Sequence, residues 1–282
     1  MTQIQLWKLS GPLYTKLEQL VIPGDVHSID ALSSTLPSGV YTTFRTYYQF
    51  KTYPIQSHID RLENSARLKG IVIHLDPKAL HAALHTIVYQ ASAHEKRLRI
   101  TVDLEHPSYD VYISIEELKT PSSKEYSAGA VAITKEFERN NPEAKSTNFL
   151  ADALAIKSTI AHDVNEVLLV DRKGKIKEGL SSNFFIIVGG RLITAGEEVL
   201  PGITRSIILE AANTAGIMVL LESPSYSQIK DCDEAFISSA SRSILPLRKI
   251  DSMDIGKQAP GDITKLLSKC FWERIERETV YF

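Results

Sequence analysis

Between two strand-like runs, the chain reads Glu178-Gly179-Leu180-Ser181-Ser182-Asn183. A short strand is predicted over residues 176–178, and the apolar run 184–188 follows the stretch directly. Glycine, serine and asparagine favour turns, so the pattern predicts strand, turn and strand. It leaves the carboxylate of Glu178 at the edge of a sheet. By itself, such a glutamate is more often a solvated group at a strand end, and this motif alone does not establish a site.

Further short strands and helices surround this turn. The turn Asp171-Arg172-Lys173-Gly174 predicts that the strands on either side of it pair as a hairpin. We expect strands near Val131 and at residues 166–170, 176–178, 183–188, 191–195, 234–239 and 244–250. We expect helices at residues 148–161, from Pro201-Gly202 to Gly216, and at residues 263–278.

The first 120 residues mix strand and helix patterns. Residues 40–53 are rich in Tyr, Thr and Phe with a turn near Gln49, which predicts a hairpin. Ser57 is a candidate cap for a helix that ends at Gly70, and a second helix is predicted over residues 77–94. Two strands are predicted at residues 98–104 and 109–115.

A polar segment separates the two halves of the chain. Residues 117–127 lack an apolar period, and Pro121, Ser122 and Ser123 lie at their centre. We place the domain boundary there, which predicts an N-terminal α/β domain of residues 1–120 and a larger C-terminal domain of residues 121–282. The fold class expected is therefore α+β with two domains.

Composition limits the kinds of partner. The chain has 282 residues, 43% of them hydrophobic, and 32 Lys and Arg oppose 34 Asp and Glu. Such a balanced charge favours small-molecule or self partners over nucleic acid or an acidic membrane. Cys232 and Cys270 match no metal-ligand or redox spacing, so we expect reduced thiols, an intracellular location and no metal site. We also expect neither a signal peptide nor a membrane span.

Two motifs are suited to binding an anion. Pro201-Gly202 stands directly before an apolar helix, whose first-turn amides are free to face a phosphate. Arg61 lies one turn into another predicted helix, where its planar guanidinium can hold a phosphate through paired hydrogen bonds. Each motif also fits an ordinary role, as helix punctuation and as a surface arginine. His58, beside Arg61, is more simply a packing or hydrogen-bonded histidine of the core.

A lysine precedes another helix. Lys145 lies on a polar loop, whereas Lys157 falls inside the apolar helix that follows. Most lysines are solvated, so composition does not single out this one.

Together, five stretches resemble the class IV aminotransferases, the fold-type IV group of pyridoxal phosphate enzymes. They are residues 39–45, 58–66, 145–148, 178–183 and 200–205, and the resemblance covers residues 39–247. The group includes branched-chain aminotransferases, D-amino acid aminotransferases and aminodeoxychorismate lyases. The resemblance implies pyridoxal 5'-phosphate as cofactor and a two-domain fold whose larger, C-terminal domain has a β-barrel-like core.

The resemblance also implies roles for single residues. Lys145 looks like the lysine that binds the cofactor as a Schiff base and moves protons during the reaction. Glu178 looks like the partner of the pyridine nitrogen, because a carboxylate there favours the protonated ring. Arg61 and the amides of Ile203 and Thr204 look like the phosphate ligands.

Some positions depart from the family pattern. In many relatives, a threonine or serine of a late loop also touches the phosphate, and our alignment places Ala240 there. Ser239 or Ser241 can take over that contact, and we assign it to Ser241. At Thr42, relatives commonly show a glutamate.

The substrate side of the pattern is less complete. Tyr41 matches a substrate-side tyrosine of the D-amino acid enzymes, and the run Lys-Ser-x-Asn at Lys145 is also closer to theirs. Their Arg-x-His trap for the substrate carboxylate is missing. Arg97 and Arg99, which alternation places on one face of a strand, are the candidates to bind that carboxylate. Facing solvent is the equally weighted alternative, and the choice between L and D substrates stays open.

The expected function is transamination between an amino acid and a 2-oxo acid. The second hypothesis is a lyase reaction of the aminodeoxychorismate lyase type on the same cofactor, and the third is a noncatalytic binding protein that retains the fold. The resemblance also implies a homodimer, and we expect a cytoplasmic enzyme with no nucleic-acid or membrane partner.

Overall fold

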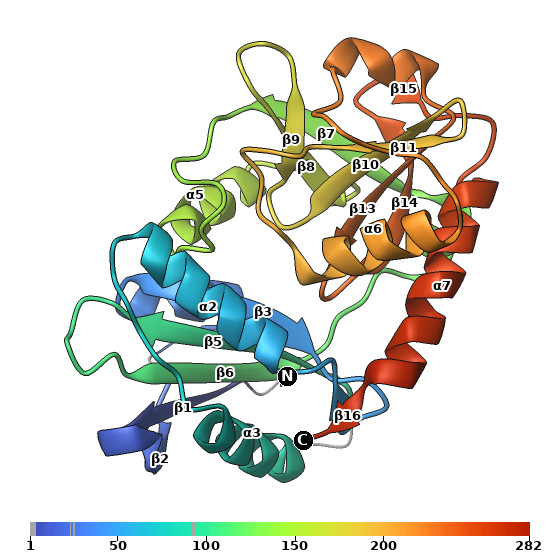
Figure 1. The fold of residues 1–282 in the computed structure, drawn as a ribbon. Coiled ribbons are helices and arrows are strands. Elements are labelled where there is room, and N and C mark those ends of the chain that lie inside the picture. The colour runs from blue at the N-terminus through green and yellow to red at the C-terminus, as the bar shows by residue number, and fades with distance from the viewer. Residues whose placement is uncertain (1–3, 23, 25, 92–93) are drawn as a thin grey trace. The chain divides into compact units, whose positions relative to one another are not determined.

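The structure is a computed structural model that describes residues 4–22, 24, 26–91 and 94–282. Its residues form two compact units (Figure 1). Unit 1 comprises residues 1–119, 144–155 and 277–282, and unit 2 comprises residues 120–143 and 156–276. The chain therefore returns twice to unit 1 after leaving it. The simpler division predicted from sequence, residues 1–120 and 121–282, differs in these two returns and stays a prediction of domain organisation.

Unit 1 is built on a five-stranded antiparallel sheet covered by two helices. The strand order is β2-β1-β6-β5-β3 (Figure 1). The strands are β1 (Gln5–Ser10), β2 (Lys16–Leu20), β3 (Gly39–Arg45), β5 (Lys96–Asp103) and β6 (Val111–Glu117). Helices α2 (Gln56–Leu68) and α3 (Pro77–Gln90) share one hydrophobic core with the sheet. Ile59 and Leu62 from α2, Leu84 from α3, and Val40 and Ile100 from the sheet are almost fully buried in it.

Smaller elements complete unit 1. They are the helices α1 (Ile29–Leu32), η1 (Pro12–Tyr14) and η2 (Ser33–Thr35), with the paired strands β4 (Lys51–Thr52) and β16 (Val280–Tyr281). A tight turn at Tyr48 and Gln49, both with positive φ, confirms the turn expected near Gln49. The expected hairpin partner was wrong, because β3 pairs with β5, and β4 pairs with β16. Each of the two strands expected in that hairpin therefore pairs with a strand from a distant part of the chain.

The two helices of unit 1 begin and end close to their predicted bounds. Asp76 caps α3 by accepting hydrogen bonds from the backbone amides of Lys78 and Ala79, with Pro77 at the first helical position. This helix ends at Gln90, earlier than the predicted residue 94, and residues 92 and 93 lie outside the described residues. Helix α2 starts at Gln56, one residue before the predicted cap Ser57.

Unit 2 contains a sheet that closes on itself. The order is β12-β11-β10-β13-β14-β7-β8-β9, and a further pairing of β9 with β10 closes six of these strands into a ring. The strands are β7 (Ala130–Glu136), β8 (Glu166–Val170), β9 (Ile176–Gly179), β10 (Asn183–Val188), β11 (Arg191–Thr194), β12 (Val219–Leu221), β13 (Glu234–Ser239), β14 (Ser243–Ile250) and β15 (Met253–Asp254). A barrel-like core was expected, and this ring confirms it.

The ring is filled by apolar side chains from its strands. Leu168, Phe184, Ile186, Ile237 and Leu245 belong to one buried cluster. The closing contact is the pairing of Asn183 on β10 with Glu178 on β9. The side chains of these two residues therefore lie at the seam of the ring.

Helices pack around the ring (Figure 1). They are α4 (Ser123–Ala128), α6 (Ile203–Thr214), η3 (Tyr226–Asp231) and most of α7 (Asp262–Glu278), and α5 (Asn148–Lys157) ends in this unit. The carboxylate of Glu234 accepts hydrogen bonds from the amides of Ile263 (3.0 Å) and Thr264 (2.7 Å) in the first turn of α7. This contact fixes the start of α7 against β13.

One segment differs from its prediction in unit 2. The polar segment 117–127, expected as a linker, contains part of α4, whose Ser122 and Glu125 form a capping box. A helix of six residues is too short to show an apolar period, so periodicity in the sequence does not predict it. The predicted hairpin at residues 171–174 is confirmed by the antiparallel pairing of β8 with β9. Across the described residues, no helix is both long and apolar enough to span a membrane.

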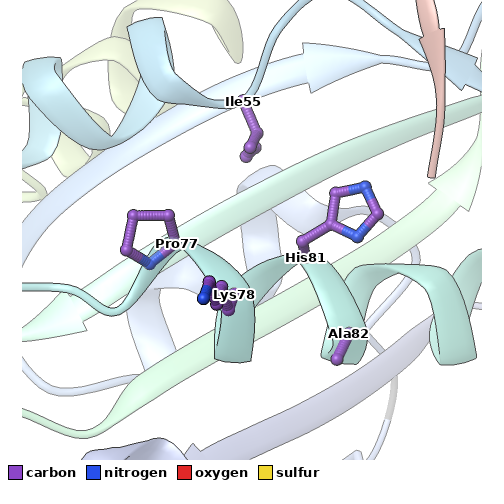
Figure 2. Close-up of a pocket in the computed structure, with 5 residues that line it drawn as sticks. All are labelled: Ile55, Pro77, Lys78, His81 and Ala82. Atoms are coloured by element: carbon purple, nitrogen blue, oxygen red, sulfur yellow. The ribbon is translucent and has the colours of Figure 1, made fainter.

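One hollow in unit 1 lies on the surface of α3. It is lined by Ile55, Pro77, Lys78, His81 and Ala82 (Figure 2). None of these residues belongs to the stretches that indicated a cofactor site.

Candidate active site

The loop that carries Lys145 is fastened to β3 and α2. The carbonyl of Lys145 accepts a hydrogen bond from the Tyr41 amide (2.9 Å), and the Lys145 amide donates to the Ser65 hydroxyl (3.2 Å). Further along, the Thr147 hydroxyl accepts from the amide of Gly39 (2.8 Å). Backbone contacts to two elements therefore hold the Lys145 backbone in place, although the loop has no regular structure of its own.

The ring of Tyr41 lies close to two cations. Lys145 Nζ and Arg99 Cζ are each 4.8 Å from the ring centroid, within the range of cation–π attraction. Tyr41 is buried in β3. The structure thus brings three predicted site residues, Tyr41, Arg99 and Lys145, together in unit 1.

Arg61 lies on α2 and donates a hydrogen bond from Nη2 to the Thr42 hydroxyl. Burial lowers the pKa of Arg61 to about 10, while Tyr41 acts in the opposite direction. The guanidinium remains charged at neutral pH. Its Nε is buried and has no hydrogen-bond partner within the described residues.

Thr42 joins Arg61 to His58. Its hydroxyl lies 2.8 Å from His58 Nδ1, so it accepts from Arg61 and donates to the histidine. Burial, followed by the charges of Arg61 and Lys145, lowers the pKa of His58 well below 6.5. His58 is therefore neutral at neutral pH, with Nδ1 as acceptor. Its ring centroid is 4.7 Å from that of Phe44, consistent with the predicted core histidine.

In unit 2, Glu178 is buried where β9 meets β10. Its Oε1 forms an ion pair with Arg139, and its Oε2 accepts a hydrogen bond from the Leu200 amide (3.2 Å). Asn183, opposite Glu178 across the strands, donates from its side chain to the Leu200 carbonyl (2.9 Å). Glu178 is thus held by a charge, a backbone amide and its position on the seam.

The segment that follows Leu200 leads into α6. Gly202 is the N-cap of this helix, and no side chain caps it. The first helical hydrogen bond runs from the Ser206 amide to the Gly202 carbonyl, which leaves the amides of Ile203 and Thr204 to face an anion. A Cβ at Gly202 would lie 2.2 Å from Asn183 Oδ1, so a larger residue there would have to displace the Asn183 side chain.

Arg205 adds positive charge to this helix start. Burial lowers the pKa of Arg205, and the Glu178 carboxylate acts in the opposite direction. Its Nη2 donates to the Ala195 carbonyl (2.6 Å). Ser241, the remaining predicted phosphate ligand, lies half-buried in the turn between β13 and β14.

Arg97 and Arg99 share one face of β5, as alternation predicted, and both bind Asp30 of α1. Arg97 also pairs with Glu116 (2.9 Å). Arg99 donates further to the Ser33 hydroxyl (2.6 Å) and the Ile29 carbonyl (3.1 Å). The alternative that both face solvent does not hold, because Arg99 is only 2% exposed and Arg97 is half-buried. Their role towards a substrate stays a prediction.

The predicted residues thus gather in two sets, one in each unit. Tyr41, Arg61, Lys145 and Arg99 belong to unit 1, and Glu178, Ile203, Thr204 and Ser241 belong to unit 2. Sequence reasoning missed Arg139, which lies in an irregular loop where nothing in the local pattern marks it. It also assigned no role to Asn183 or Thr42, although the motifs that identified their neighbours contain both.

Comparison with known proteins shows the family to which this chain belongs. The model of the amino-transferase class IV family matches residues 39–250, so the chain belongs to that family. The D-alanine aminotransferase of Listeria innocua is 32% identical over 256 residues, which cover 85% of this chain and 87% of that protein. The branched-chain-amino-acid aminotransferase of Pseudomonas aeruginosa is 24% identical, covering 80% of each. The expected family resemblance is therefore confirmed.

Solved structures show the same fold. The branched-chain aminotransferase of Thermoproteus uzoniensis, solved with norvaline, has a TM-score of 0.77 and 21% identity, covering 100% of this chain and 99% of that one. The branched-chain amino acid aminotransferase of Escherichia coli has a TM-score of 0.76 and 23% identity, covering 95% of this chain and 93% of that one. At this level of identity, the likeness concerns the fold alone.

The donors in this chain fit pyridoxal 5'-phosphate, the cofactor of the family. Within unit 1, the unsatisfied Nε of Arg61 is suited to a phosphate oxygen. Within unit 2, the uncapped amides of α6 are likewise suited to an anion. The carboxylate of Glu178 is suited to a protonated ring nitrogen. The half-buried Lys145 carries a primary amine, the kind of group to which such a cofactor attaches.

Protonation of His58 is expected to weaken the fold at acid pH. Because the folded pKa of His58 is lowered, the unfolded chain takes up this proton first as the pH falls through 6.5. The unfolding free energy should fall below that pH by at most about 1.4 kcal/mol per pH unit for one proton. Urea titrations of wild type and His58→Asn between pH 7.5 and 5 measure this.

His58→Asn retains an acceptor for the Thr42 hydroxyl but does not titrate, so its fall should be shallower. His85→Asn, at an exposed position of α3, is the matched control and should keep the wild-type slope. Equal slopes for wild type and His58→Asn would refute the assignment.

Proposed function

Because this chain belongs to the class IV aminotransferase family and transfers amino groups with pyridoxal 5'-phosphate, we propose that its amino donor is a D-amino acid with a short side chain. The enzyme moves an amino group between an amino acid and a 2-oxo acid. Similarity to the D-alanine aminotransferase of Listeria innocua over most of both chains supports the D configuration. Tyr41 and the run Lys145-Ser146-Thr147-Asn148, both closer to D-amino acid enzymes, point the same way.

Lys145 is proposed as the catalytic lysine. The main support is the position of its loop. Hydrogen bonds of the Lys145 backbone to Tyr41 and Ser65 hold this loop in place, and the Lys145 amine lies beside the Tyr41 ring. An amine held in this way can attach the cofactor and later carry a proton to and from the substrate α carbon. Pyridoxal phosphate supplies a protonated ring that withdraws electrons from that carbon.

Glu178 is proposed to hold the proton on the ring nitrogen. Its ion pair with Arg139 and its hydrogen bond from the Leu200 amide keep the carboxylate in one orientation. A fixed carboxylate stabilises a protonated nitrogen without reorganising during the reaction. Arg139 therefore acts through Glu178, as a positioning residue.

Arg61, Ile203, Thr204 and Ser241 are proposed as phosphate ligands. Arg61 offers charge and an unused donor, and the start of α6 offers two amides. Thr42 and neutral His58 support Arg61 without adding a competing charge. A phosphate held at several points keeps the cofactor bound while its covalent partner is exchanged.

Tyr41 is proposed to line the substrate side. Arg99 lies against the same ring and is the nearer candidate for the substrate carboxylate, with Arg97 behind it. Both arginines already bind Asp30, so a substrate carboxylate would have to share or displace that contact.

The oligomeric state and location are also proposals. The family resemblance supports a homodimer. The two free cysteines, Cys232 and Cys270, are compatible with a reducing cytoplasm.

A second candidate reaction is lyase chemistry of the aminodeoxychorismate type, because the same residues serve both reactions. A noncatalytic role is disfavoured, since a protein without activity has no use for both Lys145 and a buried, fixed Glu178.

A single-turnover test separates these functions. The cofactor-loaded protein is mixed with D-alanine, L-alanine, L-leucine, L-valine or aminodeoxychorismate, and absorbance follows conversion of the cofactor to its pyridoxamine form. We expect D-alanine to convert it and release pyruvate at least about tenfold faster than any L-amino acid, a difference of ~1.4 kcal/mol in barrier. Conversion by L-leucine and L-valine alone would overturn the D assignment. Pyruvate from aminodeoxychorismate with no conversion by amino acids would establish the lyase instead.

Lys145→Ala is expected to abolish covalent attachment of the cofactor. Borohydride reduction followed by mass spectrometry of the protein measures this attachment. Residual phosphate binding through Arg61 and α6 should survive. Lys157→Ala is the matched control and should still be labelled fully. Full labelling of Lys145→Ala would transfer the role to Lys157.

Glu178→Gln is expected to keep the attachment but slow the proton transfer at the substrate α carbon by about 10²-fold, because a neutral amide no longer stabilises a protonated ring. The rate of the single turnover, compared between deuterated and ordinary amino acid, reports that step. Glu198→Gln, which alters an exposed carboxylate of the same unit, is the control. A wild-type rate in Glu178→Gln would remove Glu178 from the mechanism.

A further inference from the structure

A buried ion pair joins strand β8 of unit 2 to the turn between β13 and β14. Glu166 of β8 and Arg242, in the turn between β13 and β14, approach to 2.6 Å. Their side chains are 1% and 14% exposed, so little solvent reaches the contact. Neither residue belongs to the motifs that indicated the cofactor site.

Glu166 binds the turn that follows Glu178. Its Oε2 accepts hydrogen bonds from the hydroxyls of Ser181 (3.1 Å) and Ser182 (2.7 Å). Its Oε1 accepts from the amide of Val167 (3.0 Å). One carboxylate thus holds both serines between the end of β9 and the start of β10.

Gly179 shows how closely this carboxylate packs. A Cβ there would lie 2.8 Å from Glu166 Cδ and 2.4 Å from the Ser182 hydroxyl. The Glu166 side chain therefore rests against the backbone of the residue next to Glu178. Displacement of this carboxylate would shift the peptide that directs the Glu178 side chain.

Arg242 binds the same turn from the other side and also fixes its own. Its Nη2 donates to Ser181 (2.8 Å), and its Nε and backbone amide both donate to the Ser239 hydroxyl (3.2 and 3.3 Å). Its Nη1 donates to the Asn165 carbonyl (3.1 Å). The turn held in this way contains Ser241.

The Glu166 carboxylate keeps a lowered pKa in spite of its burial. Burial acts to raise the pKa of Glu166, but the charges of Arg242 and Lys157 and the hydrogen bonds from Ser182 and Arg242 outweigh it, so this pKa is lowered. Glu166 is ionised at neutral pH. Removing either partner would leave an uncompensated charge in a buried place.

We propose that the Glu166–Arg242 ion pair is a positioning device that fixes the 179–182 turn next to Glu178 and the 240–242 turn around Ser241 relative to each other. The proposal rests on the proposed roles of Glu178 at the ring nitrogen and Ser241 at the phosphate. Neither Glu166 nor Arg242 is assigned a contact with the cofactor. The pair sets the spacing between the groups that hold the two ends of one rigid molecule, where an error near 1 Å costs about 10²-fold in rate.

The test compares four variants of the holoenzyme. They are Glu166→Gln, Arg242→Gln, the double variant, and the control Glu210→Gln, which removes the exposed ion pair of Glu210 with Arg274 in the same unit. Each is measured for melting temperature, for the dissociation constants of pyridoxal phosphate and of pyridoxal, and for kcat, KM and the pH dependence of cofactor absorbance. All are assayed well below their melting temperatures.

Arg242→Gln is expected to weaken pyridoxal phosphate binding at least about tenfold and pyridoxal binding much less, because it loosens the turn at the phosphate end. Glu166→Gln is expected to weaken both and to displace the absorbance titration, because it loosens the turn beside Glu178. Losses in kcat should exceed changes in KM. The double variant should lose no more than about the worse single variant, because the two residues act as one unit.

A merely structural role gives another result. Lower melting temperatures with wild-type cofactor affinity, wild-type kcat and an unchanged absorbance titration would overturn the proposal. Fully additive losses in the double variant would overturn it too. Wild-type turnover is measured first. If wild type forms the cofactor complex but transfers no amino group, the proposed reaction fails, while the affinity and absorbance comparison still tests the positioning role.

Discussion

The pairing of Glu178 with Asn183 closes the sheet of unit 2. It turns an open sheet into a ring, so the strands around the ring cannot slip in register without reopening it. A carboxylate at such a seam cannot swing freely. The same seam holds the Leu200 backbone through both side chains, and thereby sets where α6 begins. The pairing that closes the ring therefore also fixes the position of the Glu178 carboxylate and the start of α6.

In unit 1, backbone hydrogen bonds hold the Lys145 loop in place, and hydrogen-bond acceptors hold the buried arginines. Irregular segments keep their place only when their amides and carbonyls find partners, and the Lys145 loop finds them on Tyr41 and Ser65. Buried guanidinium groups likewise need acceptors. Arg99 has four, whereas Arg61 keeps one donor in reserve among the described residues. Arg61 therefore has a donor that a ligand can use directly, whereas a ligand at Arg99 must share or displace the contact with Asp30.

Local patterns in the sequence predicted what local chemistry determines. The helix that carries Arg61, the Pro201-Gly202 helix start and the strand end at Glu178 all follow from capping, periodicity and turn residues within a few positions. Partners distant in the chain were beyond reach. Nothing near Arg139 marks it as the partner of Glu178, and the true neighbour of β3 is a strand far along the chain. Asp30, which forms ion pairs with Arg97 and Arg99, comes from a four-residue helix without periodicity.

The glycine that opens α6 has a consequence for engineering. Serine or aspartate is preferred at an ordinary N-cap, and exchanging one for glycine costs only a few tenths of a kcal/mol. Restoring such a residue at Gly202 would be a routine step in making a helix more stable. Here its Cβ would lie 2.2 Å from Asn183 Oδ1, and its oxygen would accept hydrogen bonds from the amides that are proposed to bind the phosphate. An engineered thermostable variant should therefore be stabilised at other positions, with Gly202 kept as the N-cap of α6.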